Sequence, residues 1–157
     1  MKVRDKFKFG STSLTRLATV DEDLQKCAKK AIMCSPVDFG VPWMGGYRTA
    51  EEQKSIYDKG YSRADGTTAV SYHQSGMALD LVPFIQGTGF DYEAHGRFGI
   101  IGMLMLEAWE ELQDEGEIDK NRYLHWGGFW RNRTSRSLGW DMAHFEIRHV
   151  EQVERLS

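Results

Sequence analysis

The sequence predicts one α+β domain, in which helices pack against a small, mainly antiparallel sheet. Two stretches carry apolar residues at spacings of three and four, the pattern of amphipathic helices. Short apolar runs bounded by glycine or proline lie between and after them, as is typical of strands. With 157 residues the chain can bury a core without disulfides. We therefore expect a single domain over residues 1–157, with an irregular N-terminal arm over about 1–18.

The first predicted helix runs from about Asp21 to Cys34 and ends before Pro36. Its apolar face consists of Leu24, Cys27, Ala28, Ala31 and Ile32. The chain's two cysteines, Cys27 and Cys34, lie seven positions apart on this helix, which separates them by roughly 10 Å along its axis. That separation is too long for a disulfide, so we expect both to be reduced and buried.

The remaining elements follow from similar patterns. Residues 37–43 suit a short strand, and Thr49 suits the N-cap of a surface helix that runs to Gly60. A polar loop follows over residues 61–69. The longest helix is expected from about Glu93 to Gln113, with a broad apolar stripe that forms core. Aromatic residues around glycines near residues 123–130 suggest further strands, and residues 150–157 suggest a last helical turn.

Composition excludes several classes of protein. The hydrophobic fraction is 41%, the charged fraction is 27% and the net charge is −3. This balance gives no general attraction to nucleic acid, so no nucleic-acid partner is expected. No run of 18 apolar residues occurs, and the N-terminus lacks the apolar stretch of a signal peptide. We expect no membrane insertion, and synthesis and folding in the cytoplasm.

The segment 70–83, VSYHQSGMALDLVP, offers two possible metal ligands. His73 and Asp80 lie seven residues apart, which suits two ligands presented by a turn and the strand that follows it. Gly76 lies between them and allows the backbone to turn without a Cβ clash. A catalytic zinc ion usually takes three protein ligands and one water, so a third ligand must come from elsewhere.

The segment 140–147, WDMAHFEI, offers that third ligand in His144 and a carboxylate in Asp141. Three ligands with one open position allow zinc to acidify a bound water, and a nearby carboxylate can take the proton. Either segment alone is more often structural or solvent-exposed. On spacing alone, Arg48 after a double glycine is an ordinary surface cation.

Taken together, the segments resemble a known family. Residues 71–80 match the S-x-H-x-x-G-x-A-x-D signature of the D-alanyl-D-alanine carboxypeptidase family of zinc peptidases, and residues 141–146 resemble its second signature. Residues 46–53 and 126–130 are also similar to family segments. The size and the D-x-x-H form resemble the phage endolysin branch, which cleaves the L-alanyl-D-glutamate bond of peptidoglycan stem peptides.

The resemblance implies a role for each residue of the site. His73, Asp80 and His144 would bind Zn²⁺, and Asp141 would be the general base and later the general acid. Arg48 would lie near the scissile carbonyl or a substrate carboxylate. Two further residues would meet the substrate or its groove: Ser71 by a hydrogen bond, and Trp126 as a lining residue, for which packing is an equal alternative. Glu146 would either orient a zinc-bound histidine or be a plain strand residue.

The implied function is that of an endolysin, a monomeric zinc metallopeptidase that hydrolyses bacterial peptidoglycan. Without an export signal, it would need a holin-like pore to pass from the host cytoplasm to the cell wall. Two alternatives stay open. One is a D,D-carboxypeptidase that removes terminal D-alanine, and the other is a non-catalytic zinc-binding module.

Overall fold

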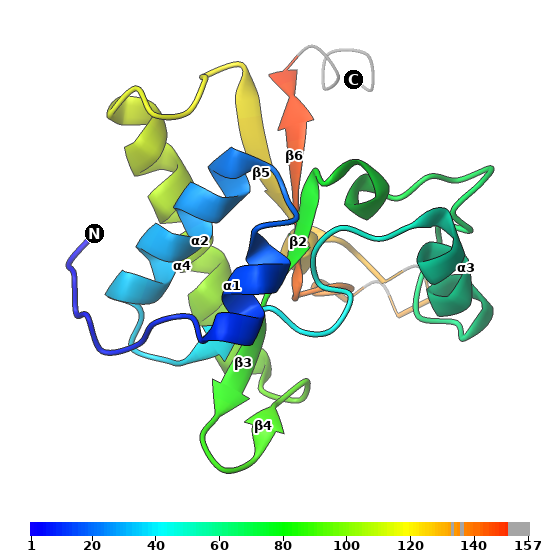
Figure 1. Ribbon diagram of the computed structural model, residues 1–157, viewed down its shortest axis with the longest axis horizontal. Helices are drawn as coiled ribbons and strands as arrows, with labels where there is room; N and C mark the ends of the chain where they lie inside the picture. Colours follow the sequence, from blue (N-terminus) through cyan, green and yellow to red (C-terminus); the bar gives the residue numbers. More distant parts are fainter. Residues whose placement is uncertain (133, 136, 151–157) are drawn as a thin grey trace.

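A computed structural model describes residues 1–132, 134–135 and 137–150 and confirms the predicted α+β class (Figure 1). The four helices of this part of the chain are α1 (Ser11–Leu17), α2 (Glu22–Cys34), α3 (Ala50–Asp58) and α4 (His95–Asp114). The strands are β1 (Phe39–Gly40), β2 (Ala78–Asp80), β3 (Val82–Ile85), β4 (Gly89–Phe90), β5 (Arg122–Trp126) and β6 (His144–His149). Two short 3₁₀ helices are also present: η1 (Tyr72–Ser75) precedes β2, and η2 (Gly127–Phe129) follows β5.

The strands form two small antiparallel sheets, in the orders β2-β6-β5 and β1-β3-β4. Only Leu81 separates β2 from β3, so the chain passes directly from one sheet into the other. In the first sheet Asp80 pairs with His144, and Ala78 pairs with Glu146. The register of β2 on β6 therefore brings the two sequence motifs together.

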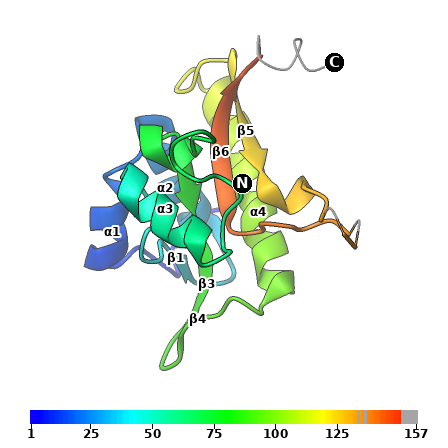
Figure 2. The same ribbon diagram turned by 90° about the vertical axis from the view of Figure 1, so that its right-hand side faces the viewer.

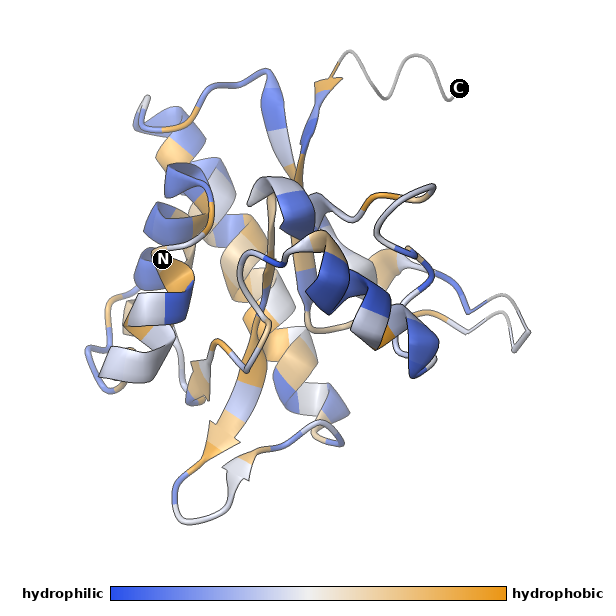
Figure 3. Ribbon diagram, turned by 45° about the vertical axis from the view of Figure 1, so that its right-hand side comes forward, coloured by the Kyte–Doolittle hydropathy of each residue, from blue (hydrophilic) through white to orange (hydrophobic). Residues whose placement is uncertain are grey.

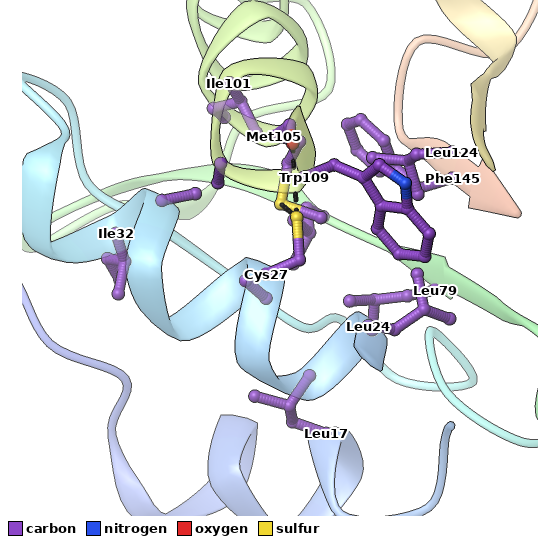
Figure 4. Packing of buried hydrophobic residues seen from close by; sticks show 14 of the residues in the cluster. Leu17, Leu24, Cys27, Ile32, Leu79, Ile101, Met105, Trp109, Leu124 and Phe145 are labelled. Atoms are coloured by element: carbon purple, nitrogen blue, oxygen red, sulfur yellow. Dashed lines mark hydrogen bonds between the residues drawn. The ribbon is translucent and has the colours of Figure 1, made fainter. Parts of the chain in front are cut away.

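Helices α2 and α4 pack on one side of the sheets and form the core with them (Figure 1). Leu24 and Cys27 of α2 lie near Met105 and Trp109 of α4, and the Cys27 and Met105 sulfur atoms are 3.9 Å apart (Figure 4). Leu79 and Phe145 complete this part of the core from β2 and β6. Each large apolar side chain buried in this way contributes about 1.5–3 kcal/mol. Both cysteines are free and buried, as expected.

Helix α3 lies on the opposite side of β2 from α2 and α4 (Figures 1 and 2). Its ribbon is mostly hydrophilic, whereas apolar residues concentrate on α4 and the strands (Figure 3). The helix begins with the expected Thr49 cap: Thr49 Oγ1 accepts from Glu52 N, and Glu52 Oε2 accepts from Thr49 N. Among the described residues, none of the helices is both long and apolar enough to cross a bilayer.

Two predicted boundaries change. The irregular arm expected over about 1–18 is wrong for residues 11–17, which form α1; the segment is too short to show helical periodicity, yet it buries Leu17 completely. The strand expected over 37–43 shrinks to β1, because Pro42 cannot donate to a ladder. The helical turn expected over 150–157 lies outside the described residues except for Val150.

Candidate metal centre

Three side chains from the two motifs converge at one point. His73 comes from η1, Asp80 ends β2 and His144 begins β6. His73 Nε2 lies 3.1 Å from His144 Nδ1, and Asp80 Oδ1 lies 3.2 Å from each of these nitrogens. Both histidines are buried, and Asp80 is largely buried. The cluster therefore presents two imidazole nitrogens and one carboxylate oxygen to a shared point.

The outer hydrogen bonds of the histidines leave the convergent nitrogens free to bind a cation. His73 Nδ1 donates to the Gly46 carbonyl at 2.7 Å, and His144 Nε2 donates to Glu146 Oε2 at 2.9 Å. With protons on those atoms, His73 Nε2 and His144 Nδ1 each carry a lone pair. Zinc–ligand bonds of about 2.0 Å in a tetrahedron separate ligand atoms by roughly 3.3 Å, close to the observed spacings. The donor set thus fits Zn²⁺.

Glu146 accepts a hydrogen bond from His144 and is itself held by Arg148. Arg148 donates to Glu146 Oε1 through Nε at 2.6 Å and through a terminal nitrogen at 2.5 Å. The carboxylate is nearly inaccessible to solvent, and its pairing with His144 and Arg148 lowers its pKa despite burial. The contacts of Glu146 therefore match the alternative in which it orients a histidine, and not that of a plain strand residue.

The turn that carries His73 is specified locally. Ser71 Oγ accepts from His73 N at 3.3 Å, and Gln74 Oε1 accepts from Ser71 N at 3.0 Å, which together cap η1. Gly76 ends the turn at φ +71°, the left-handed conformation that favours glycine. The contacts of Ser71 within the chain thus serve to present His73.

The loop before α3 supplies three successive carbonyls to the site. The Met44 carbonyl accepts from Arg48 Nε at 2.6 Å, that of Gly45 from Asp80 N at 2.7 Å, and that of Gly46 from His73 Nδ1. A Cβ at Gly46 would overlap Thr19 Oγ1 and approach the Arg16 carbonyl to 2.7 Å, so only glycine fits there. Sequence reasoning did not assign these carbonyls to the site, although the double glycine Gly45-Gly46 shortly before Arg48 was a signal.

Arg48 is 9% exposed and lies behind Asp80. One terminal nitrogen, Nη2, pairs with Asp80 Oδ2 at 2.5 Å, and the other, Nη1, donates to Gln53 Oε1 at 3.3 Å. These contacts rule out the alternative of an ordinary surface cation. They also give Arg48 a role that sequence reasoning missed, since it binds the oxygen of Asp80 that faces away from the histidines.

Asp141 lies in the turn just before β6, where the charges of Asp80, His144, His73 and Arg48 all act on it. Burial raises the pKa of Asp141, and the negative charge of Asp80 raises it further. A carboxylate with a raised pKa can accept a proton and later return it. The Asp141 carbonyl accepts from His144 N at 3.2 Å, so the turn that bears Asp141 leads directly into His144.

The chain is similar to proteins of known activity over most of its length. Residues 5–153 match the model of a family described as phage L-alanyl-D-glutamate peptidase. The chain belongs to this family. It is 38% identical over 106 residues to the L-alanyl-D-glutamate peptidase of Escherichia phage T5, covering 68% of this chain and 74% of that one. The crystal structure of the Serratia marcescens L-Ala D-Glu endopeptidase ChiX is similar with a TM-score of 0.66 and 25% identity, over 91% of this chain and 92% of that chain.

In this family member Trp126 belongs to the core. It is 6% exposed, stacks on Phe145 with an interplanar angle of 9°, and donates from Nε1 to the Met142 carbonyl at 2.8 Å. Its neighbour Gly127 approaches Asp141 so closely that a Cβ would overlap the Asp141 carbonyl. These contacts support the packing alternative for Trp126, and its hydrogen bond to the Met142 carbonyl ties it to the turn that bears Asp141.

Proposed function

We propose that the chain hydrolyses the L-alanyl-D-glutamate bond of peptidoglycan stem peptides with the help of a bound zinc ion. The observation that carries the proposal is the convergence of His73 Nε2, Asp80 Oδ1 and His144 Nδ1, each fixed by an outer hydrogen bond. These three residues would hold Zn²⁺, which when bound would polarise the scissile carbonyl and acidify a water molecule.

Asp141 transfers the protons in this proposed reaction. As general base it accepts a proton from the attacking water, and as general acid it delivers that proton to the departing amine. The C–N bond between L-alanine and D-glutamate breaks while a C–O bond forms, which leaves a new L-alanine carboxylate and a free D-glutamate amine. The raised pKa of Asp141 supports both half-steps.

Arg48 and Ser71 take part in substrate binding in this proposal. Arg48 has five N–H groups and donates three of them to Met44, Gln53 and Asp80. The other two can donate to the substrate carbonyl or carboxylate. Ser71 uses its oxygen as an acceptor for His73 N, and its hydroxyl proton can be donated to the substrate. Trp126 acts through packing and is not assigned a substrate contact.

The cellular setting extends the same proposal. The protein works as a monomer, is made in the host cytoplasm and reaches the cell wall through a holin-like pore at lysis. Its partner is bacterial peptidoglycan, without nucleic acid and without membrane insertion.

The two alternative functions make different products. A D,D-carboxypeptidase would release D-alanine, and a non-catalytic module would release nothing. The names of the family and of both relatives favour the endopeptidase. The turn that bears Asp141 leads directly into His144, whose backbone N donates to the Asp141 carbonyl, and a carboxylate placed there favours a catalyst over a binding module.

One experiment tests the function and its metal. Permeabilised Gram-negative cells are treated with purified protein, with chelator-treated protein and with chelator-treated protein restored by Zn²⁺, and turbidity is followed. We expect lysis, its loss and its recovery, with muropeptides that end in L-alanine detected by mass spectrometry. Release of D-alanine alone would establish the carboxypeptidase, and full activity after removal of the metal would refute zinc dependence.

A further inference from the structure

Gln53 is a polar side chain at the centre of a chain of contacts that leads to the metal centre. It lies on α3, a helix with a hydrophilic surface, yet it is 0% exposed. Its Oε1 accepts from Arg48 Nη1 at 3.3 Å, and its Nε2 donates to Ser62 Oγ at 2.8 Å and to the Ala64 carbonyl at 2.9 Å. A buried amide is costly unless its polar atoms are paired, and these are.

The guanidinium of Arg48 is a rigid planar fork, so its contacts are geometrically linked. Nε is fixed by the Met44 carbonyl and Nη1 by Gln53. With two nitrogens of the planar group held in place, the third has little freedom to move. Gln53 and Met44 together therefore set the position at which Nη2 meets Asp80.

At Asp80 the two carboxylate oxygens have separate partners. Oδ2 pairs with Arg48 at 2.5 Å, whereas Oδ1 faces His73 Nε2 and His144 Nδ1 at 3.2 Å each. A carboxylate can bind a cation through one oxygen or through both. A charge-assisted hydrogen bond on Oδ2 opposes the second mode, because that oxygen would have to leave Arg48.

We propose that Gln53 is a positioning residue that keeps Asp80 a one-oxygen ligand by holding Arg48 against Oδ2. With Oδ2 held by Arg48, a zinc ion bound by His73, Asp80 and His144 would keep a position for water, as catalytic zinc sites do. The inference rests on the proposed function only in that it needs the metal to bind at His73, Asp80 and His144. It concerns metal coordination in the absence of substrate.

The test compares a variant that loses all the Gln53 contacts with one that loses a single loop-side contact. Gln53→Met preserves the length of the side chain but removes its bonds to Arg48, Ser62 and Ala64, whereas Ser62→Ala removes one loop-side bond and leaves the bond to Arg48 in place. Each protein is stripped with chelator and titrated with Co²⁺ while visible absorption is recorded. Its Zn²⁺ Kd is measured by competition with a chromophoric chelator.

We expect Gln53→Met to weaken Zn²⁺ binding about tenfold, the lower end of the effect of outer partners of metal ligands. Its Co²⁺ bands should weaken as Asp80 turns to bind through both oxygens and the coordination number rises. Ser62→Ala should keep the wild-type spectrum. Arg48→Lys, which lacks the fork that joins Gln53 to Asp80, should reproduce the spectrum of Gln53→Met and decides the matter if Gln53→Met does not fold.

The outcomes separate the two proposals. A folded Gln53→Met, or Arg48→Lys in its place, with the wild-type Co²⁺ spectrum and Zn²⁺ Kd would overturn the role of Gln53 while the zinc site stands. Failure of the wild-type protein to bind Co²⁺ or Zn²⁺ would overturn the metal centre itself, and the role of Gln53 with it.

Discussion

His144 donates a hydrogen bond from Nε2 to Glu146 Oε2 at 2.9 Å, across two positions of a single strand. Alternate residues of a strand point to the same face, so β6 carries both the histidine and the group that orients it. Arg148, two positions further along, binds the same carboxylate. The two-residue repeat of β6 thus places His144, Glu146 and Arg148 in a hydrogen-bonded His–Glu–Arg series on one face of the strand.

Replacing Glu146 with alanine tests this series. His144 would lose the acceptor that fixes its proton on Nε2, so we expect Zn²⁺ affinity to fall by roughly 10–100-fold. Arg148→Ala leaves the His144–Glu146 bond in place and should weaken binding less. Competition with a chromophoric chelator measures both variants. Unchanged affinity in Glu146→Ala would show that His144 needs no orienting partner.

Asp141→Asn separates metal binding from proton transfer. An amide cannot accept the proton of the attacking water, so peptidoglycan hydrolysis should fall by about 10²–10⁴-fold while the zinc content stays near wild type. The paired variant is His73→Ala, which should lose the metal as well as the activity. Metal analysis and a turbidity assay are run on the same samples. Wild-type activity in Asp141→Asn would exclude Asp141 as the base.

Two glycines of α4 form a matched pair for stability. A Cβ at Gly102 would overlap the ring of Trp126, whereas nothing lies within 4 Å of a Cβ at Gly99. We expect Gly102→Ala to lower the free energy of unfolding by about 1–3 kcal/mol through overpacking. Gly99→Ala should raise it by about 0.5–1 kcal/mol, since alanine favours a helix interior. Urea denaturation measures both, and equal values would refute the tight packing of Trp126 on α4.

The stability of chelator-treated protein should depend on pH through His144. Burial lowers the pKa of His144, but hydrogen bonds with Asp80 and Glu146 outweigh burial and raise it from 6.5 to about 10. The folded-state pKa exceeds the unfolded one, so this stabilisation is complete below pH 6.5 and is lost as pH rises toward about 10.

Urea unfolding at several pH values between about 6 and 10 checks this expectation. The zinc-loaded protein provides the control, because metal binding already requires the deprotonated imidazole and should hold stability up over the same range. A free energy of unfolding that is flat with pH in the chelator-treated protein would contradict the raised pKa of His144.

Parts of this molecule were predictable because their side chains carry the signal. The periodic apolar faces of α2 and α4 fixed those helices to within about two residues. The motif residues His73, Asp80 and His144 were identifiable because imidazole and carboxylate side chains are the ligand types that metal sites use, and they do converge.

Other parts had no such signal. The site uses the carbonyls of Met44, Gly45 and Gly46, and a carbonyl is present at every residue whatever its type. Gln53 reads as one more polar residue of a surface helix until α3 is placed beside Arg48. Trp126 fitted a groove as well as a core, and only its burial decides between them.

The order of strands β2-β6-β5 carries a consequence for synthesis. Of the described strands, β6 is the last to be made, yet it is the central one, and β2 and β5 pair with it on either side. Chains fold from the N-terminus as they leave the ribosome, but this sheet cannot assemble until residue 149 has emerged. A nascent or truncated chain without β6 has neither the sheet nor His144, so hydrolytic activity is confined to molecules whose translation has passed that strand.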